Sequence, residues 1–318
     1  MNDGAAHSRW GMLFRVRILA VALALFSFLL PGCAGAPPHG LPAARAEANR
    51  LNEMGVEAAR RGDTAAAIRD FDGAYRGYAA IEHYPGMMTA LLNIARVGTG
   101  SGNFPAARKA LAEAGSMTGF VPSLAAELFF EHARLLLREG KAAEALPWGE
   151  RAVNSADETA KGRMTNLLAD IAHRVGDRER AGTLAVNGLA LSGNAGDRRE
   201  TANALRLLAE LALERGETTL AESRFNEALS VDKELATGSR IAADLQGLAR
   251  TAEKAGAQEK AADFWGRAAN VSLGGGDRAG AAASLERVAQ IREQAGDTAA
   301  AMKVRSLIAD MMRDSAVK

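Results

Sequence analysis

Residues 205–228, LRLLAELALERGETTLAESRFNEA, hold two apolar helical stripes separated by a break at Gly216. The small residues Ala209 and Ala221 lie on either side of the break, and the aromatic Phe225 lies in the second stripe. A unit of this size buries both stripes only by packing against similar units on either side. The rest of the chain supplies those neighbours as copies of the same pattern.

A glycine break recurs along the chain with a period close to 40 residues. The breaks are Gly62, Gly102, Gly140, Gly176, Gly216, Gly256 and Gly296, at intervals of 40, 38, 36, 40, 40 and 40 residues. Five residues after each break stands an alanine: Ala67, Ala107, Ala145, Ala181, Ala221, Ala261 and Ala301. Seven residues before each break stands a small residue: Gly55, Ala95, Ala133, Ala169, Ala209, Ala249 and Ala289. Because small side chains let two helices approach closely, we predict that these positions are the crossing points of seven helix pairs.

Helix start and stop signals accompany the breaks. Glycine tolerates the left-handed conformation that ends a helix. The residues that follow a break and are suited to cap the next helix are Asp63, Asn103, Asp177 and Asp297. In the loops between pairs, Asp197 and Asp277 lie 80 residues apart, with Thr237 midway, and predict the starts of first helices. Pro147 conflicts with the pattern, because a proline inside a helix removes a hydrogen bond, and we expect a kink there.

This spacing resembles that of the tetratricopeptide repeat family. The matching residues are Leu51-x2-Met54-Gly55-x2-Ala58, Ala67-x3-Phe71, Ala221-x3-Phe225 and Ala261-x3-Trp265. The resemblance covers residues 44–314, although the first Trp of the family is replaced and its closing Pro is absent. HEAT-like repeats share the period, but the Ala-x3-aromatic signature favours the tetratricopeptide type. The resemblance implies an all-α solenoid, a right-handed superhelix of about seven antiparallel helix pairs whose first helices line a concave groove that holds peptides or proteins.

Composition agrees with a helical fold and excludes some functions. Hydrophobic residues make up 48% of the chain but aromatic residues only 5%, and alanine supplies much of the apolar share, which favours close-packed helices over sheet. The formal net charge of +1 argues against a nucleic-acid binder that works by bulk electrostatics. Because Cys33 is the one cysteine, neither an intrachain disulfide nor a thiolate metal cage is possible.

The N-terminal residues are typical of an export signal. Residues 1–32 combine a basic segment with a 13-residue apolar run at positions 18–30, which is short for a bilayer span and suits a signal peptide. Translation starts at Met1 or at Met12. The run ends in Leu30-Pro31-Gly32-Cys33, which resembles the lipobox of bacterial lipoproteins, with Pro31 departing from the pattern.

That resemblance implies cleavage before Cys33, lipidation of Cys33, and a flexible tether over residues 33–43. It also implies an outer-membrane destination facing the periplasm, because Ala34 rather than Asp follows the cysteine. The alternative is an ordinary secretory signal with a chance cysteine. After removal of residues 1–32, the repeat domain at 44–314 and a short tail at 315–318 remain, with 36 basic against 37 acidic residues.

No pattern of catalytic or cofactor-binding residues is present in the sequence. His83, His132 and His173 have no metal-ligand partners at the required spacing. The glycines at 274, 276 and 280 follow a predicted helix rather than a strand, so they do not form a dinucleotide-binding turn. Glu210 and Glu214 lie on one helical face. Such a pair more often belongs to a solvated helix surface than to a catalytic site. The sequence therefore predicts a protein that is not an enzyme and carries no metal or cofactor.

The predicted groove carries charge of both signs. Its candidate partner-binding residues are Arg96, Arg134, Arg138 and Arg174 in the earlier repeats and Glu210, Glu214, Glu253, Glu286 and Glu293 in the later ones. A groove that is basic at one end and acidic at the other could fix the direction of a bound segment. The alternative is that these charges belong to ordinary solvated helix faces.

The predicted function is a non-enzymatic scaffold, exported and lipid-anchored in the cell envelope, that binds protein or peptide partners. Resemblance to other repeat lipoproteins implies work in envelope assembly, pilus or secretion support, or recruitment of cell-wall enzymes. Two alternatives stay open: a soluble exported interaction module without an anchor, and an enzyme whose site has an unrecognised form.

Overall fold

The computed structural model describes residues 40–313, and this part of the chain is helical, without a β-strand. The helices are α2 (Gly40–Arg60), α3 (Thr64–Ala79), α4 (Tyr84–Ser101), α5 (Phe104–Gly115), the short 3-10 helix η1 (Pro122–Leu124), α6 (Ala125–Arg138), α7 (Ala142–Ser155), α8 (Glu158–Arg174), α9 (Arg178–Asn194), α10 (Arg198–Glu214), α11 (Thr218–Glu234), α12 (Gly238–Lys254), α13 (Gln258–Gly274), α14 (Arg278–Gln294) and α15 (Thr298–Arg313). The prediction of an all-α solenoid is confirmed.

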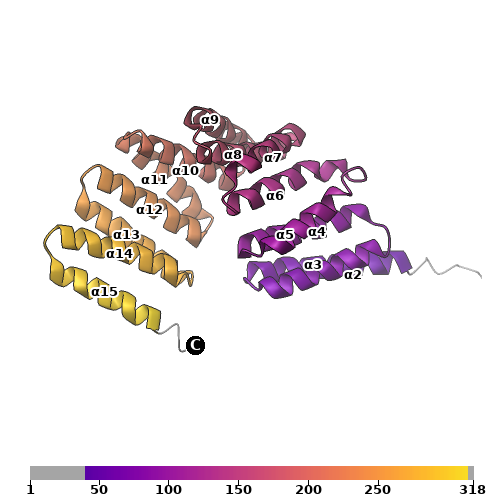
Figure 1. The fold of residues 1–318 in the computed structure, drawn as a ribbon, viewed down its shortest axis with the longest axis horizontal. Coiled ribbons are helices and arrows are strands. Elements are labelled where there is room, and N and C mark those ends of the chain that lie inside the picture. Colours follow the sequence, from indigo (N-terminus) through magenta and orange to yellow (C-terminus); the bar gives the residue numbers. More distant parts are fainter. Residues whose placement is uncertain (1–39, 314–318) are drawn as a thin grey trace, which may run out of the picture.

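The helices form consecutive hairpins, from α2–α3 to α14–α15, which stack side by side in a curved row (Figure 1). Each helix packs against the helices before and after it in the chain. The first helices of neighbouring hairpins also touch directly, as α4 and α6 do, and α8 and α10. Contacts therefore stay between neighbouring repeats, which is the energetic arrangement of a solenoid.

The predicted glycine breaks end the first helices in the expected conformation. All seven glycines have positive φ, between +76° at Gly256 and +91° at Gly176. The four predicted caps, Asp63, Asn103, Asp177 and Asp297, each accept a hydrogen bond from a backbone N–H in the first turn of the second helix, as Asp177 does from Arg180 at 3.1 Å. A residue with a Cβ is strained in this left-handed conformation, which is why glycine recurs there.

The small residues lie where the helices cross. The alanines five residues after the breaks are at most 1% exposed, and those seven residues before the breaks are fully buried. At the end of the row the pattern stops, because Ile308 is only half-buried and Ala301 is the one buried residue of α15. Alanine is thus the residue that allows the close approach of every pair.

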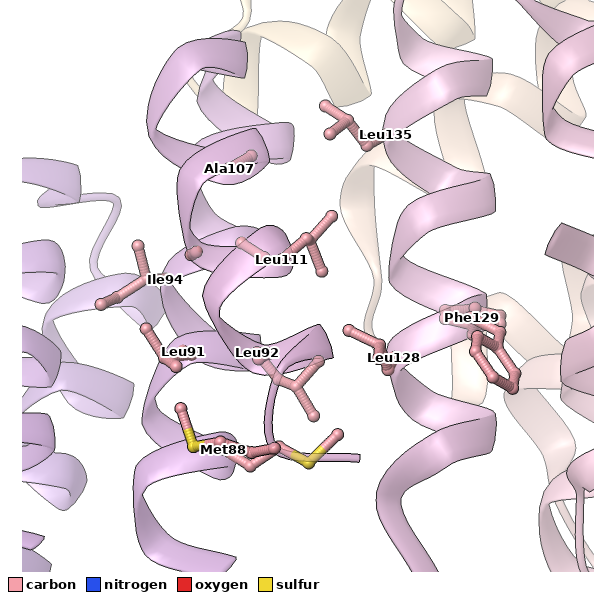
Figure 2. Close-up of a cluster of buried hydrophobic side chains, with 14 of the residues drawn as sticks. Met88, Leu91, Leu92, Ile94, Ala107, Leu111, Leu128, Phe129 and Leu135 are labelled. Carbon is pink, nitrogen blue, oxygen red and sulfur yellow. The ribbon is translucent and has the colours of Figure 1, made fainter. Parts of the chain in front are cut away.

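The core is divided into clusters between hairpins rather than gathered at one centre. One large cluster joins α4, α5 and α6, and Figure 2 shows how its side chains meet across these three helices. The labelled residues are Met88, Leu91, Leu92, Ile94, Ala107, Leu111, Leu128, Phe129 and Leu135. A second large cluster forms around Phe225 and Trp265 in the later repeats. Each hairpin is therefore stabilised by apolar contacts between its own two helices and with its nearest neighbours.

Three local features differ from a uniform repeat. Helix α7 continues as one helix through Pro147, from Ala142 to Ser155. Thr237 directly precedes α12, as predicted for the start of a first helix, but its side chain makes no capping bond, and its hydroxyl donates instead to the Leu235 carbonyl at 3.3 Å. The connection from α5 to α6 is longer than the others and contains η1, because α5 ends early at Gly115.

The predicted signal peptide, Cys33 and the tail at 315–318 lie outside the described residues. The repeat domain begins slightly earlier than predicted, since α2 starts at Gly40, within the range expected for the tether. None of the described helices combines the length and the apolar character needed to cross a membrane.

Candidate functional site

The first helices of the hairpins line a groove with a cavity of about 1030 Å³. Its walls come from α4, α6, α8, α10 and α12, and no second helix contributes a lining residue. Seven arginines line it: Arg96, Arg134, Arg163, Arg174, Arg199, Arg206 and Arg240. Four carboxylates also line it: Glu127, Asp170, Glu200 and Glu210.

The middle of the groove has an apolar floor with amide groups beside it. The apolar lining residues are Phe130, Leu167, Ala204 and Leu207. Asn166 lies between α8 and α10, where its amide nitrogen donates to the carbonyl of Glu200 at 2.9 Å and to the Glu200 carboxylate at 3.2 Å. Asn203 donates to the same carboxylate at 3.0 Å. Asn166 therefore links the two central helices, while the Asn203 bond stays within α10.

At the N-terminal side of the groove, arginines converge on the buried carboxylate of Glu131. Arg96 Nε donates to Glu131 Oε1 at 2.9 Å, and Arg134 pairs with the other oxygen at 3.2 Å. Arg163 forms an ion pair with Glu127 and stacks on the Phe130 ring, with Cζ 4.4 Å from the centroid. Burial lowers the pKa of Arg134, and although Glu131 opposes this, nearby Arg96, Arg163 and Arg138 lower it further. The cations therefore outnumber the carboxylates here.

At the C-terminal side, Arg206 bridges two buried carboxylates. Its Nε donates to Asp244 Oδ1 at 2.6 Å, and its Nη2 donates to Asp232. Burial raises the pKa of Asp244 to about 6 against the effect of Arg206, and the neighbouring Asp232 charge also raises it. Asp232 and Asp244 each keep one buried oxygen without a hydrogen-bond partner.

Arg199 and Arg240 differ from the other groove arginines, because neither forms an ion pair with any residue in 40–313. Arg240 Nη1 donates to the backbone carbonyl of Arg199 at 3.4 Å, which keeps the two together at the wall. Burial lowers the pKa of Arg240, as do, to a smaller extent, the charges of Arg206 and Arg199. These guanidinium groups retain donors for a ligand.

The structure brings together part of the predicted groove set. Arg96, Arg134, Arg174 and Glu210 line the cavity, while Arg138 lies exposed at the end of α6 beside Arg134. The groove arginines that were not predicted are Arg163, Arg199, Arg206 and Arg240. The sequence feature that could have predicted them is an arginine and a carboxylate about one repeat apart, as in Arg206 and Asp244, which are 38 residues apart.

The predicted acidic residues outside the cavity have partners within the chain. Glu214 bonds to His173 at 2.7 Å and to Arg178 at 2.6 Å. Glu253 accepts from Trp265 and from Arg287, both at 2.6 Å. The two remaining acidic residues, Glu286 and Glu293, both pair with Arg305. The later repeats therefore present paired charges rather than a row of free carboxylates.

The histidines have structural surroundings. His83 caps α4 by accepting from the Gly86 N–H at 3.0 Å. His132 stacks on Trp148 with centroids 4.1 Å apart, and burial, together with the Arg151 charge, lowers its pKa to about 4. Across the described part of the chain, no group of His, Cys, Asp or Glu is arranged to hold a metal ion.

Comparison with known families matches residues 160–234, which span α8 to α11, to the tetratricopeptide repeat. A comparison with curated proteins gives no match. The hairpins from α8 to α11 are therefore similar to the tetratricopeptide repeat.

Solved structures share the fold at low sequence identity. A Rap protein complexed with competence and sporulation factor is 13% identical, with a TM-score of 0.62, covering 84% of this chain and 76% of that chain. A STAND-family ATPase with a tetratricopeptide repeat sensor from Pyrococcus horikoshii is 13% identical, with a TM-score of 0.61, covering 84% of this chain and 42% of that chain. BtubC from P. vanneervenii is 19% identical, with a TM-score of 0.57, covering 67% of this chain and 90% of that chain.

Proposed function

We propose that this chain is a non-enzymatic scaffold that holds a protein or peptide segment in the groove of its first helices. The observation that carries the proposal is the cavity itself, which runs across α4 to α12 and combines an apolar floor with hydrogen-bond donors. Long grooves of this kind suit an extended or helical segment better than a compact ligand. The Rap protein of the same fold was solved with competence and sporulation factor bound, which supports a binding role for such a solenoid.

Site-specific photocrosslinking in cells tests the proposal. A photoreactive residue replaces Leu207 in the groove, and the matched control carries it at Val186, which is 59% exposed on the second helix α9. We expect discrete crosslinked partners from position 207 that are absent from position 186. Adducts of equal pattern at both positions, or none at 207, would contradict binding in the groove.

We further propose that the scaffold is exported and anchored by a lipid on Cys33, at the outer membrane facing the periplasm. The support is the apolar run at 18–30, which ends three residues before Cys33, the one cysteine of the chain. A partner held there would belong to envelope assembly, to pilus or secretion machinery, or to the recruitment of cell-wall enzymes. More than one acyl chain gives stable anchoring.

Metabolic labelling with a fatty acid distinguishes the anchored form from a soluble exported module. We expect label in the wild-type chain and none in Cys33→Ser, together with release of the variant from the membrane fraction. An unlabelled wild-type chain in the soluble exported fraction would favour the unanchored alternative.

A further inference from the structure

The groove presents more positive than negative charge to solvent, although the mature chain is nearly neutral. Seven arginines and four carboxylates line the cavity, and the additional carboxylates that pair with these arginines lie beneath the surface. The Arg96 side chain is 44% exposed whereas that of Glu131 is 0% exposed, and Arg206 is 19% exposed whereas Asp244 is 0% exposed. A ligand in the groove therefore meets guanidinium groups before it meets their counter-ions.

The positive charge gathers in two places. The first cationic subsite is formed by Arg96, Arg134 and Arg163, with Arg138 beside it, around the two carboxylates of Glu127 and Glu131. The second cationic subsite is formed by Arg199 and Arg240, which lack ion-pair partners among the described residues. Because guanidinium donors favour carboxylates in fixed geometry, both subsites suit acidic side chains.

The floor between the two subsites is apolar. Phe130, Leu167 and Leu207 line the cavity between the arginines of α6 and those of α10 and α12. An ion or a highly charged polymer would leave these side chains without an apolar partner, whereas a peptide with apolar side chains would cover them. The floor therefore favours a peptide over a simple polyanion.

We propose that the groove takes an extended peptide segment in which acidic side chains at both ends flank a short apolar stretch. The inference rests on the proposed function and names the chemistry of its partner. First helices of neighbouring hairpins lie roughly 10 Å apart, so subsites on α6 and α10 are about 20 Å apart. An extended chain advances about 3.3 Å per residue, which places the acidic groups about six residues apart.

Selection from a displayed library of random ten-residue peptides on the full chain tests the proposal. We expect the selected peptides to carry Asp or Glu in two positions about six residues apart, with Leu, Ile or Phe between them. Selected peptides that are neutral or basic would overturn it. So would acidic peptides whose binding is unchanged when the apolar residues become Ser, or is abolished by polyphosphate alone, because that pattern reports bulk charge.

A variant pair assigns the binding to the second subsite. In Arg199→Glu with Arg240→Glu, we expect the selected peptide to bind roughly tenfold more weakly or worse. The matched control is Lys233→Glu with Arg278→Glu, which changes the same total charge at residues that line no part of the cavity and form no ion pair within residues 40–313. Equal weakening in both variants would contradict the assignment.

The outcomes separate this inference from the proposed function. If position 207 crosslinks to a partner but the selected peptides show no acidic preference, the groove binds a segment of different chemistry and only this inference fails. If position 207 yields no partner and the library yields no binders, the proposed function fails with it.

Discussion

At the scale of single residues, two glycines inside helices pack directly against aromatic rings of neighbouring helices. The Phe225 ring is fully buried on α11 and lies against Gly247 of the next hairpin. A Cβ at Gly247 would lie 2.3 Å from Phe225 Cε1, a distance that no relaxed structure tolerates. A Cβ at Gly55 would likewise lie 2.7 Å from the nearest atoms of the Phe71 ring. Glycine stands at these positions inside α2 and α12 because a neighbouring ring occupies the space that a Cβ would need.

Truncation of Phe225 to Ala should lower the free energy of unfolding by about 3–5 kcal/mol, because it removes a fully buried ring and leaves a cavity. Gly247→Ala should lower it by about 1–3 kcal/mol through overpacking against the same ring. Urea denaturation followed by circular dichroism measures both. An unchanged midpoint in Phe225→Ala would contradict the packing between α11 and α12.

Two titratable groups, the partly buried His132 and the buried Asp244, should shift stability in opposite directions with pH. The pKa of His132 is lowered from 6.5 to about 4, so the folded state binds fewer protons than the unfolded state and loses stability as pH falls through this window. The pKa of Asp244 is raised from 3.8 to about 6, so the folded state binds more protons and gains stability as pH falls from above 6 toward 4.

Removing each group should therefore change the pH dependence with opposite sign. Between pH 7.5 and 4.5, His132→Gln should lose less stability than the wild type, and Asp244→Asn should lose more. Each difference should be about 1–3 kcal/mol, since one pKa unit corresponds to 1.36 kcal/mol. Urea unfolding at the two pH values gives the change in the free energy of unfolding with pH, so a pH-independent effect of the substitution cancels. The same change with pH in the wild type and both variants would contradict the pKa shifts of His132 and Asp244.

At the scale of elements, the turns between the later hairpins require a residue with positive φ, and one of them holds alanine instead of glycine. Gly196, Ala236 and Gly276 occupy equivalent turns, each about 40 residues from the next, and all three have positive φ. Ala236 has φ of +51°, where a Cβ costs about 1–2 kcal/mol. The alanine is tolerated because helices α11 and α12 are held by the core on both sides of the turn.

Ala236→Gly should stabilise the fold by about 0.5–1 kcal/mol, because glycine relieves the strain but adds freedom to the unfolded chain. The matched control is Gly276→Ala at the equivalent turn, which should destabilise by a similar amount or more. Differential scanning calorimetry measures both midpoints. A fall in the midpoint of Ala236→Gly would show that this turn is not strained.

At the scale of the whole molecule, stability should vary along the row of hairpins. A central helix such as α10 packs against neighbours on both sides, whereas α15 lies at the end of the row and buries only Ala301 (Figure 1). In a solenoid each repeat is stabilised by nearest-neighbour contacts. The end of the row has fewer of them.

Hydrogen exchange should therefore be faster in α14 and α15 than in α8 and α10, because local opening costs less where fewer apolar contacts are lost. Mass spectrometry of peptides after timed exchange measures the difference, with the equally helical segment 198–214 as an internal reference. Uniform protection from α8 to α15 would mean that the row unfolds as one unit instead.

Much of the fold could be predicted because the contacts of a repeat lie at fixed offsets in the sequence. The glycine breaks and the alanines at the crossings appear at positions such as Gly216 and Ala221, and the structure places them as the spacing predicts. Thr237 marks the start of α12 as predicted, but it makes no capping bond, because residue type alone does not determine the side-chain geometry of a cap.

The candidate site could be predicted only in part, because it depends on distances between three helices at a time. Arg199 and Arg206 look alike in the sequence, yet Arg206 binds two buried aspartates while Arg199 has no ion-pair partner among the described residues. Likewise, Glu253 resembled a groove residue but is held by Trp265 and Arg287.

The sequence by itself determined the helix pairs, their turns and their close crossings, because these follow from the backbone needs of glycine and the small size of alanine. The tertiary structure alone decided which charges of the groove are satisfied within the chain and which remain open to a ligand. Long side chains reach across several helices, so their pairing depends on how the hairpins stack.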